Sequence, residues 1–303
     1  MKAKVNKTNE FIAFCKITKN LSDKTICAYK QDLAAYERYV NETGDTNVMR
    51  YVSYLIDTNH KTTTIKRHIA TLGQYYKYVY RNDKISNPML QFEFKLKSEK
   101  TLPRTISVRD VKRLLATLYK LRDNATTEFA AFQITRDLAL IDLLCSTGIR
   151  IGEAAAISVD DVDLRSKIIL IHGKGKKERL IYLSCAETVA NLKHWLVLRS
   201  ELAPSHNYVF VNRKLTPISI HGIENIFSKY RELAQINVHA TPHYLRHTFA
   251  TNLLANGSDL RSVQEILGHS NVSITERYTE VTTSRKIKVL KKFNYRNNLL
   301  ENI

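Results

Sequence analysis

The chain has 303 residues, of which 44% are hydrophobic and 25% are charged, with nine glycines and five prolines. This composition excludes collagen-like, low-complexity and disordered classes, and the length favours two domains. The 47 basic residues outnumber the 29 acidic residues, which gives a formal net charge of +18. Such an excess favours a polyanionic partner, with nucleic acid as the first candidate and an anionic membrane surface as the second.

Basic residues are in excess along the whole chain and not only in a tail. Residues 1–100 carry 18 basic and 10 acidic residues, and residues 101–303 carry 29 basic and 19 acidic residues. We therefore expect both halves of the chain to face the same polyanion.

The sequence predicts a cytoplasmic protein without a membrane contact. No apolar run approaches the roughly 18 residues that a bilayer-crossing helix needs, and the first residues lack the apolar core of a signal peptide. The four cysteines stand far apart and in no metal-binding pattern, which is typical of small buried side chains in a reducing compartment. They are Cys15, Cys27, Cys145 and Cys185.

Residues 1–93 show only helical periodicity and predict a small helical bundle. Helices are expected over 9–17, 22–40, 48–56 and from 62 onwards. Ser22 is a favourable N-cap for the second of them. In the last helix, Lys66 and Arg67 lie off the apolar face, so this domain presents a basic surface that suits DNA.

Between residues 94 and 106 the apolar periodicity lapses, which indicates a linker between domains. Lys95, Lys97 and Arg104 make this segment basic. It suits a strap across a phosphate backbone and it suits an ordinary solvated linker equally well, so these residues alone leave both interpretations open.

Residues 107–303 predict a mainly helical domain with one small antiparallel sheet. Helices are expected over 107–119, 129–146, 186–202 and 219–235, and the remainder is helical with breaks at Gly257 and Gly268. Segments 167–172 and 179–183 alternate as the strands of a hairpin around the turn GKGKKE, and 208–212 is expected to be a short strand. The predicted fold class is therefore mainly α with a small antiparallel sheet, in two domains.

The densest polar cluster is the segment TPHYLRH that begins at Thr241. Thr241 and Pro242 form a strong helix start, which places His243 and Arg246 on one face near the helix N-terminus. Backbone N–H groups and the helix dipole favour phosphate there, and the arginine fork matches phosphate oxygens. His247, one turn after His243, can share the site. A solvated basic helix end explains the pattern about as well.

Arg150 follows a Thr-Gly turn and opens the next helix, where it needs an anionic partner. Glu153 lies three residues further on and can supply that partner as a surface i, i+3 pair. On spacing alone, this ordinary pair is the better interpretation.

The hairpin turn carries Lys174, Lys176 and Lys177, with Arg179 beside it. The segment is not a P-loop, because GxxxxGK[ST] is absent and a strand follows. A mobile lysine at this turn can enter a DNA groove or donate a proton. Taken alone, the turn is better explained as an ordinary lysine-rich surface turn.

The segment LGHSNVSITERY ends one helix at Gly268, places His269 after it and carries Tyr278 on the next helix. By default, one tyrosine among sixteen is a core aromatic residue. Glu276 and Arg277 beside it make its surroundings more polar.

Asp160, Asp161 and Asp163 raise the alternative of a metal-dependent nuclease, since paired carboxylates hold Mg²⁺. They stand directly before a strand and without a further carboxylate at motif spacing. A solvated turn explains them better, and the sequence contains no zinc-binding or HExxH pattern. We therefore expect no metal and no other cofactor.

Together, these segments resemble the active-site signature of the tyrosine recombinase, or phage integrase, family, most closely its Xer-like branch. The shared segments are TGxRxxE, GKGxKER, HxLRH and LGH…Y, in this order. The matching catalytic positions are Arg150, Lys174, His243, Arg246, His269 and Tyr278. The resemblance covers nearly the whole chain, since the first domain and the linker are similar to the family's core-binding domain.

The resemblance implies a two-domain clamp around duplex DNA and a chemistry that uses neither metal nor ATP. Arg150 and Arg246 would hold the scissile phosphate. Tyr278 would attack the phosphorus and leave a 3′-phosphotyrosyl link and a free 5′-hydroxyl. Basic residues expected on the DNA are Lys66, Arg67, Lys95, Lys97, Arg104, Lys176, Lys177 and Arg179.

The resemblance also implies supporting roles. His243 is the candidate general base, and Lys174 is the candidate acid for the leaving 5′ oxygen. His269 would hydrogen-bond the phosphate, while Glu153 and His247 would orient neighbouring groups.

The expected assembly, as in the family, is a homo-tetramer on paired recombination sites in double-stranded DNA, with a hetero-tetramer containing a related recombinase as an alternative. The tail after residue 293 contains Leu299, Leu300 and Ile303. It is expected to dock on a neighbouring subunit, and a frayed terminus is an equal alternative. Two other functions stay open: a type IB topoisomerase, which uses the tyrosine chemistry without synapsis, and a DNA-binding protein without chemistry.

Overall fold

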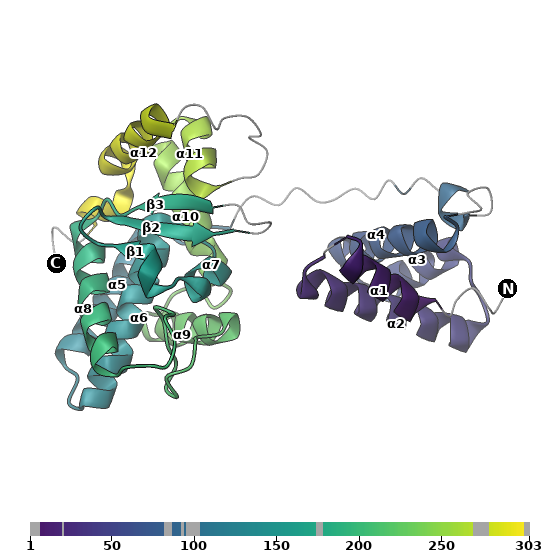
Figure 1. Cartoon of the computed structure of the whole chain (residues 1–303), viewed down its shortest axis with the longest axis horizontal. Helices are drawn as coiled ribbons and strands as arrows, with labels where there is room; N and C mark the ends of the chain where they lie inside the picture. Colours follow the sequence, from purple (N-terminus) through teal and green to yellow (C-terminus); the bar gives the residue numbers. More distant parts are fainter. Residues whose placement is uncertain are drawn as a thin grey trace. The chain divides into compact units, whose positions relative to one another are not determined.

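The computed structural model describes residues 7–19, 21–81, 87–91, 94, 104–173, 178–268 and 279–299. The chain divides into two compact units, Met1–Thr101 and Leu102–Ile303, whose elements are labelled in Figure 1. The boundary between the units falls inside the segment expected to be a linker. In the described part of the chain, no helix combines the length and the apolar character needed to cross a membrane.

The first unit is built of helices, as its periodicity predicts. They are α1 (Thr8–Ile17), α2 (Asp23–Thr43), α3 (Val48–Asp57), α4 (Thr62–Val79) and the 3-10 turn η2 (Pro88–Gln91). Ser22 caps α2, because its hydroxyl accepts a hydrogen bond from the backbone N–H of Thr25 at 3.4 Å. Gly44 ends the same helix in the left-handed conformation, with a φ of 70°.

Tyrosines fill much of the core of the first unit. Tyr36 and Tyr51 are each 1% exposed. The hydroxyl groups of Tyr36 and Tyr76 share a hydrogen bond of 2.8 Å. These rings supply a large buried apolar area, and the Tyr36 hydroxyl also donates to the carbonyl oxygen of Thr46 at 2.7 Å, so both hydroxyls have partners inside the bundle.

The second unit is mainly helical and contains one small sheet. Its helices are α5 (Val108–Asp123), α6 (Glu128–Thr147), α7 (Ile151–Ala156), α8 (Ala186–Glu201), α9 (Ile220–Leu233), α10 (Pro242–Ala255), α11 (Leu260–Leu267) and α12 (Thr279–Phe293), with 3-10 turns η3 (Val159–Asp161) and η4 (Tyr295–Asn298). Helix α6 is central: every residue from Thr135 to Thr147 is buried, and α5, α8 and α10 pack against it. A helix buried on all sides is a core element.

The sheet consists of β1 (Val162–Asp163), β2 (Ile168–His172) and β3 (Glu178–Tyr182), antiparallel and in this order. The predicted hairpin is confirmed, with Ile169 opposite Ile181 and Ile171 opposite Arg179. The short strand β1 extends it on the β2 side.

The expected strand at 208–212 is wrong. This segment forms only isolated bridges, of Tyr208 with Ser158 and of Val211 with Pro217. Its apolar residues do indicate burial, since Phe210 is 0% exposed. However, single loop residues pair with the segment, and a strand requires a neighbouring strand.

All four cysteines are free thiols. Cys15, Cys145 and Cys185 are buried, as predicted. Cys27 is exposed, because it follows the buried Ile26 on α2 and lies off the apolar face of that helix.

The C-terminal tail is anchored in its own domain. The turn η4 brings Arg296 onto Asp142 of α6, where Arg296 Nε donates a hydrogen bond to Asp142 Oδ1 at 2.7 Å and both side chains are 0% exposed. Burial alone would lower the pKa of Arg296, but the charge of Asp142, its hydrogen bond with Arg296 and the nearby Cys185 and Tyr119 together raise it. Leu299 is buried as well, so the tail up to this residue is part of the core and is not frayed. Leu300 and Ile303 lie outside the described residues.

We expect Arg296→Met to lower the free energy of unfolding by about 3–5 kcal/mol, because Asp142 would remain buried without its countercharge. The matched control is Arg285→Met, which removes an exposed pair with Asp259 and should cost less than about 1 kcal/mol. Urea unfolding followed by circular dichroism measures both changes. Equal losses for the two variants would contradict the central role of the buried pair.

Candidate active site

Two arginines from separate elements converge on the carboxylate of Glu153. Arg150 is the N-cap of α7, and its backbone N–H donates to Glu153 Oε2 while its Nη1 donates to Oε1, both at 2.8 Å. From β3, Arg179 donates through Nη1 to Oε1 at 2.9 Å and through Nη2 to Oε2 at 2.8 Å. The i, i+3 pair that the spacing indicates is therefore present, but it is one half of a larger cluster.

Glu153 is ionised at the centre of this cluster. Its side chain is 10% exposed. Burial alone would raise its pKa, but hydrogen bonds from Arg179 and from the Arg150 backbone, together with the charge of Arg179, lower the pKa to about 2. The carboxylate contacts are thus complete at neutral pH and weaken only as the pH falls through this value.

Arg246 extends the cluster from α10. Its Nη1 donates to the carbonyl oxygen of Gly148 at 2.7 Å, and its Nη2 donates to the carbonyl oxygen of Leu267 at 2.9 Å. Burial, and next the charge of Arg150, lower the pKa of Arg246 to about 10. The guanidinium therefore stays charged at neutral pH and lies close enough to Arg150 for the two charges to interact.

Two glycines with left-handed backbone allow these groups to meet. Gly148 has a φ of 63°, and a Cβ there would lie 2.5 Å from Cδ1 of Phe249 on α10. Gly268 has a φ of 67°, and a Cβ there would lie 2.7 Å from Cδ of Arg179. A side chain at either position would strain the backbone and displace Phe249 or Arg179.

Helix α10 begins as predicted, with Thr241 as N-cap and Pro242 at the start of the helix. His243 and His247 are exposed, and their i, i+4 spacing places them on one face. His243 also lies one turn before Arg246, whose guanidinium is fixed by the two carbonyls. The structure thus brings Arg150, Glu153 and Arg246 together and places both histidines on the helix that carries Arg246.

Three predicted catalytic residues and two lysines of the hairpin turn lie outside the described residues. They are Lys174, Lys176, Lys177, His269 and Tyr278. The elements on either side of them are described: β2 and β3 flank the lysines, and α11 and α12 flank His269 and Tyr278.

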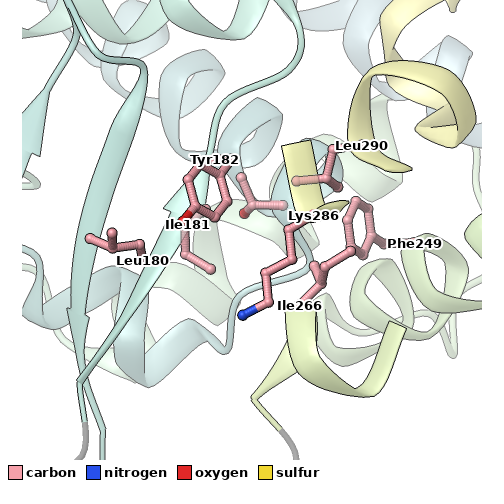
Figure 2. Close-up of a pocket in the computed structure, with 8 residues that line it drawn as sticks. Leu180, Ile181, Tyr182, Phe249, Ile266, Lys286 and Leu290 are labelled. Atoms are coloured by element: carbon pink, nitrogen blue, oxygen red, sulfur yellow. The ribbon is translucent and has the colours of Figure 1, made fainter. Parts of the chain in front are cut away.

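The helix that follows position 278 packs against the hairpin. Helix α12 contacts β3, α10 and α11, and Figure 2 shows a pocket where these elements meet, with the side chain of Lys286 among apolar groups. The lining residues are Thr147, Leu180, Ile181, Tyr182, Phe249, Ile266, Lys286 and Leu290. This packing holds α12 against the strand that carries Arg179.

The acidic residues of η3 and β1 make structural contacts. Asp161 Oδ1 lies 2.9 Å from Nε2 of His172, the last residue of β2 before the hairpin turn, and this hydrogen bond raises the pKa of His172. Asp163 accepts hydrogen bonds from the backbone N–H groups of Arg165 and Ser166. Among the residues that the structure describes, no cluster of three or more His, Cys, Asp or Glu side chains could bind a metal ion.

Two basic residues expected on DNA have defined partners. Arg67 of α4 forms an ion pair with the buried Asp32 at 2.9 Å while its side chain stays 46% exposed, and Lys66 is half-buried beside it. Arg104 Nη1 donates to the hydroxyl of Tyr244 on α10 at 3.5 Å. Outside the described residues lie Lys95 and Lys97.

Arg179 differs most from its expected place. The sequence predicts that Arg179 contacts DNA together with the lysines of the turn. In the structure, its side chain is only 17% exposed, and its guanidinium binds Glu153. Strand alternation carries a signal for this, because Arg179 shares the face of β3 with the buried Ile181. By contrast, no residue pattern predicts that the backbone carbonyls of Gly148 and Leu267 bind Arg246, because every residue has a backbone carbonyl.

Two family models match the chain. The phage integrase family model matches residues 105–285, which include the whole described cluster. The model of the phage integrase N-terminal SAM-like domain matches residues 8–83. Together they match most of each unit.

Curated relatives match over nearly their whole length. Tyrosine recombinase XerC of Bacillus subtilis (strain 168) is 33% identical over 287 residues, which are 90% of this chain and 90% of that protein. Tyrosine recombinase XerD of Staphylococcus haemolyticus (strain JCSC1435) is 34% identical over 300 residues, which are 95% of this chain and 98% of that protein.

Solved structures share the fold. XerH site-specific recombinase, in a post-cleavage complex with palindromic difH substrate, gives a TM-score of 0.69 at 21% identity and covers 98% of this chain and 84% of that chain. The Tn1549 transposon integrase, in complex with transposon right end DNA, gives a TM-score of 0.69 at 16% identity and covers 93% and 98%. The chain therefore belongs to the phage integrase family, as a tyrosine recombinase of its Xer-like branch.

Proposed function

We propose that this enzyme is a site-specific DNA recombinase that cuts and rejoins DNA strands through a 3′-phosphotyrosyl intermediate. The observation that carries the proposal is the fixed pair of cations Arg150 and Arg246, held by Glu153 and by two backbone carbonyls. Preorganised positive groups of this kind stabilise a developing anion. The relatives named as tyrosine recombinases support the same reaction type.

In the proposed reaction, Arg150 and Arg246 contact the non-bridging oxygens of one scissile phosphate. Negative charge on these oxygens increases in the five-coordinate transition state, so fixed guanidinium groups stabilise that state more than the ground state. Arg246 supplies a full charge at neutral pH because its pKa stays about 10. The two arginines can thus fill the electrostatic role that a divalent metal fills in many nucleases.

Tyr278 is the proposed nucleophile. Its phenol oxygen bonds to phosphorus while the bond from phosphorus to the 5′ oxygen breaks; His243 takes the phenol proton and Lys174 gives a proton to the 5′ oxygen. His269 hydrogen-bonds the phosphate, and His247 orients neighbouring groups. Attack by the 5′-hydroxyl of a second strand reverses these steps and releases the tyrosine. The tyrosyl ester keeps the energy of the phosphodiester, so rejoining needs no ATP.

The proposed partner is double-stranded DNA, in the cytoplasm. XerH site-specific recombinase in complex with difH substrate and the Tn1549 integrase in complex with transposon end DNA support this partner. Exchange of strands needs two paired sites, so a homo-tetramer is the proposed assembly and a hetero-tetramer with a related recombinase is the alternative. Docking of the tail on a neighbouring subunit is proposed only for residues after Leu299, because Arg296 and Leu299 are buried in their own domain.

Two other functions differ in their products. A type IB topoisomerase would relax circular DNA without exchanging strands. A DNA-binding protein without chemistry would form no covalent adduct. Recombination requires both an adduct and exchanged strands.

We expect Tyr278→Phe to abolish the covalent DNA adduct and to retain duplex binding, because it removes only the attacking oxygen. The substrate is a nicked suicide duplex whose site is identified by sequencing DNA crosslinked to the wild-type protein in its native cell. A protease-sensitive shift on a denaturing gel measures the adduct, and native gels measure binding. Tyr208→Phe, at an exposed tyrosine outside the cluster, is the matched control and should leave the adduct intact.

An adduct formed by Tyr278→Phe would refute the choice of nucleophile. If the wild type forms no adduct on any such duplex, the DNA-binding alternative is favoured.

Cleavage and strand exchange should persist in EDTA and without ATP, within about twofold of the rate in Mg²⁺. The reason is that charge neutralisation comes from arginine side chains and bond energy is conserved in the tyrosyl ester. Suicide-substrate cleavage and recombinant product are measured in parallel with and without chelator. Loss of cleavage on chelation would favour a metal-dependent nuclease.

A further inference from the structure

We propose that Arg179 is a positioning residue that holds Arg150 and Arg246 in phosphate-binding geometry from strand β3. The inference rests on the proposed function and adds a residue that was expected to contact DNA. Two contacts support it, one made by the terminal nitrogens of Arg179 and one made by its Cδ and Nε atoms.

The first contact is the bidentate pair with Glu153. Each oxygen of Glu153 accepts one hydrogen bond from Arg150 and one from Arg179, so the plane of the carboxylate is set from both sides. Without Arg179, the carboxylate would keep only its contacts within α7 and could rotate together with the Arg150 side chain. Arg179 therefore fixes Arg150 through Glu153.

The second contact is with the turn at the end of α11. A Cβ on Gly268 would lie 2.7 Å from Cδ and 2.9 Å from Nε of Arg179, so the backbone of this turn lies directly against the arginine stem. Nε is buried and has no hydrogen-bond partner among the described residues, so Arg179 meets this turn by close approach and not by a hydrogen bond from Nε. The preceding residue, Leu267, provides a carbonyl that holds Arg246. Arg179 thus supports the acceptors of both phosphate arginines.

The low exposure of the Arg179 side chain indicates that it does not bind the phosphate directly. The Arg179 side chain is 17% exposed, against 45% for Arg150. Both terminal nitrogens donate to Glu153. Its backbone lies in β3 opposite Ile171, in a paired strand, so the side chain starts from a rigid base. These features favour an action through neighbours.

The first test compares rates of adduct formation on the suicide duplex. Arg179→Met should lower the rate by about 10- to 100-fold, since it loosens the geometry of the phosphate site. Arg179→Lys keeps the charge and loses the fork, so its rate should fall between those of the wild type and Arg179→Met. Arg122→Met removes an arginine that binds Asp123 outside the cluster and should change the rate by less than about twofold.

The second test separates positioning of charge from general loss of structure. A duplex with a methylphosphonate at the scissile position lacks one anionic oxygen, so cleavage depends less on the arginine clamp. Relative to the wild type on the same duplex, the deficits of Arg150→Met and Arg179→Met should both shrink, to within about threefold. A purely structural defect would stay the same on both duplexes.

The third test asks whether Arg179 acts through Glu153. If it does, the double variant Glu153→Gln/Arg179→Met should form the adduct no more slowly than the slower of the two single variants, within about threefold.

Thermal unfolding of every variant checks the fold, and Arg179→Lys replaces Arg179→Met in the comparison if Arg179→Met fails to fold. A rate for Arg179→Met equal to the wild type, an unchanged deficit on methylphosphonate, or fully additive losses would each overturn the proposal. Absence of a wild-type adduct would instead refute the proposed function.

Discussion

Arg150, Arg179 and Arg246 lie close together and their positive charges repel each other. The largely buried carboxylate of Glu153 reduces this repulsion. Burial lowers the pKa of Arg246 most, and the charges of Arg150 and Arg179 lower it further. Glu153 offsets part of that repulsion by accepting four hydrogen bonds, and its pKa of about 2 keeps the negative charge in place. The cluster contains three guanidinium groups and one carboxylate, which binds two of them, so it keeps an excess of positive charge that suits a phosphodiester. Removal of this anion would weaken the site by letting the cations separate.

Arg246 has a second physical role, because its two acceptors are the carbonyl ends of helices. Gly148 is the C-cap of α6 and Leu267 is the last residue of α11, where backbone carbonyls lack partners within the helix. A cation at these ends also meets the negative pole of each helix dipole. The same guanidinium that faces the proposed phosphate therefore joins two helices, and its orientation is set by backbone that α6 buries in the core. Such rigidity is what electrostatic preorganisation requires.

The sequence predicts the elements better than the contacts between them. Periodicity and caps locate α2 and α10, and alternation around a glycine-rich turn locates the hairpin, because these signals are local. The order of motifs identifies Arg150 and Arg246 as partners at one site. What spacing misses is that Glu153 binds Arg179, 26 residues away in sequence, across two elements. The strand prediction for 208–212 is wrong for a related reason. The apolar run correctly indicates burial, but strand pairing depends on neighbouring segments that are distant in sequence.

Residues close to the first and the last described positions of the second unit are bound to α10 and α6, the two helices that carry or contact Arg246. At its start, the backbone N–H of Ile106 donates to Thr248 Oγ1 at 2.8 Å, and that hydroxyl donates to the Ile106 carbonyl at 3.0 Å. Thr248 lies on α10 two residues after Arg246. At its end, Arg296 binds Asp142 on α6, less than two turns before Gly148. Movement of either chain end would therefore have to break a buried polar contact on a helix that supports Arg246. Loss of such contacts is costly in a low-dielectric interior. They therefore keep Arg246 in place when either end of the unit is displaced.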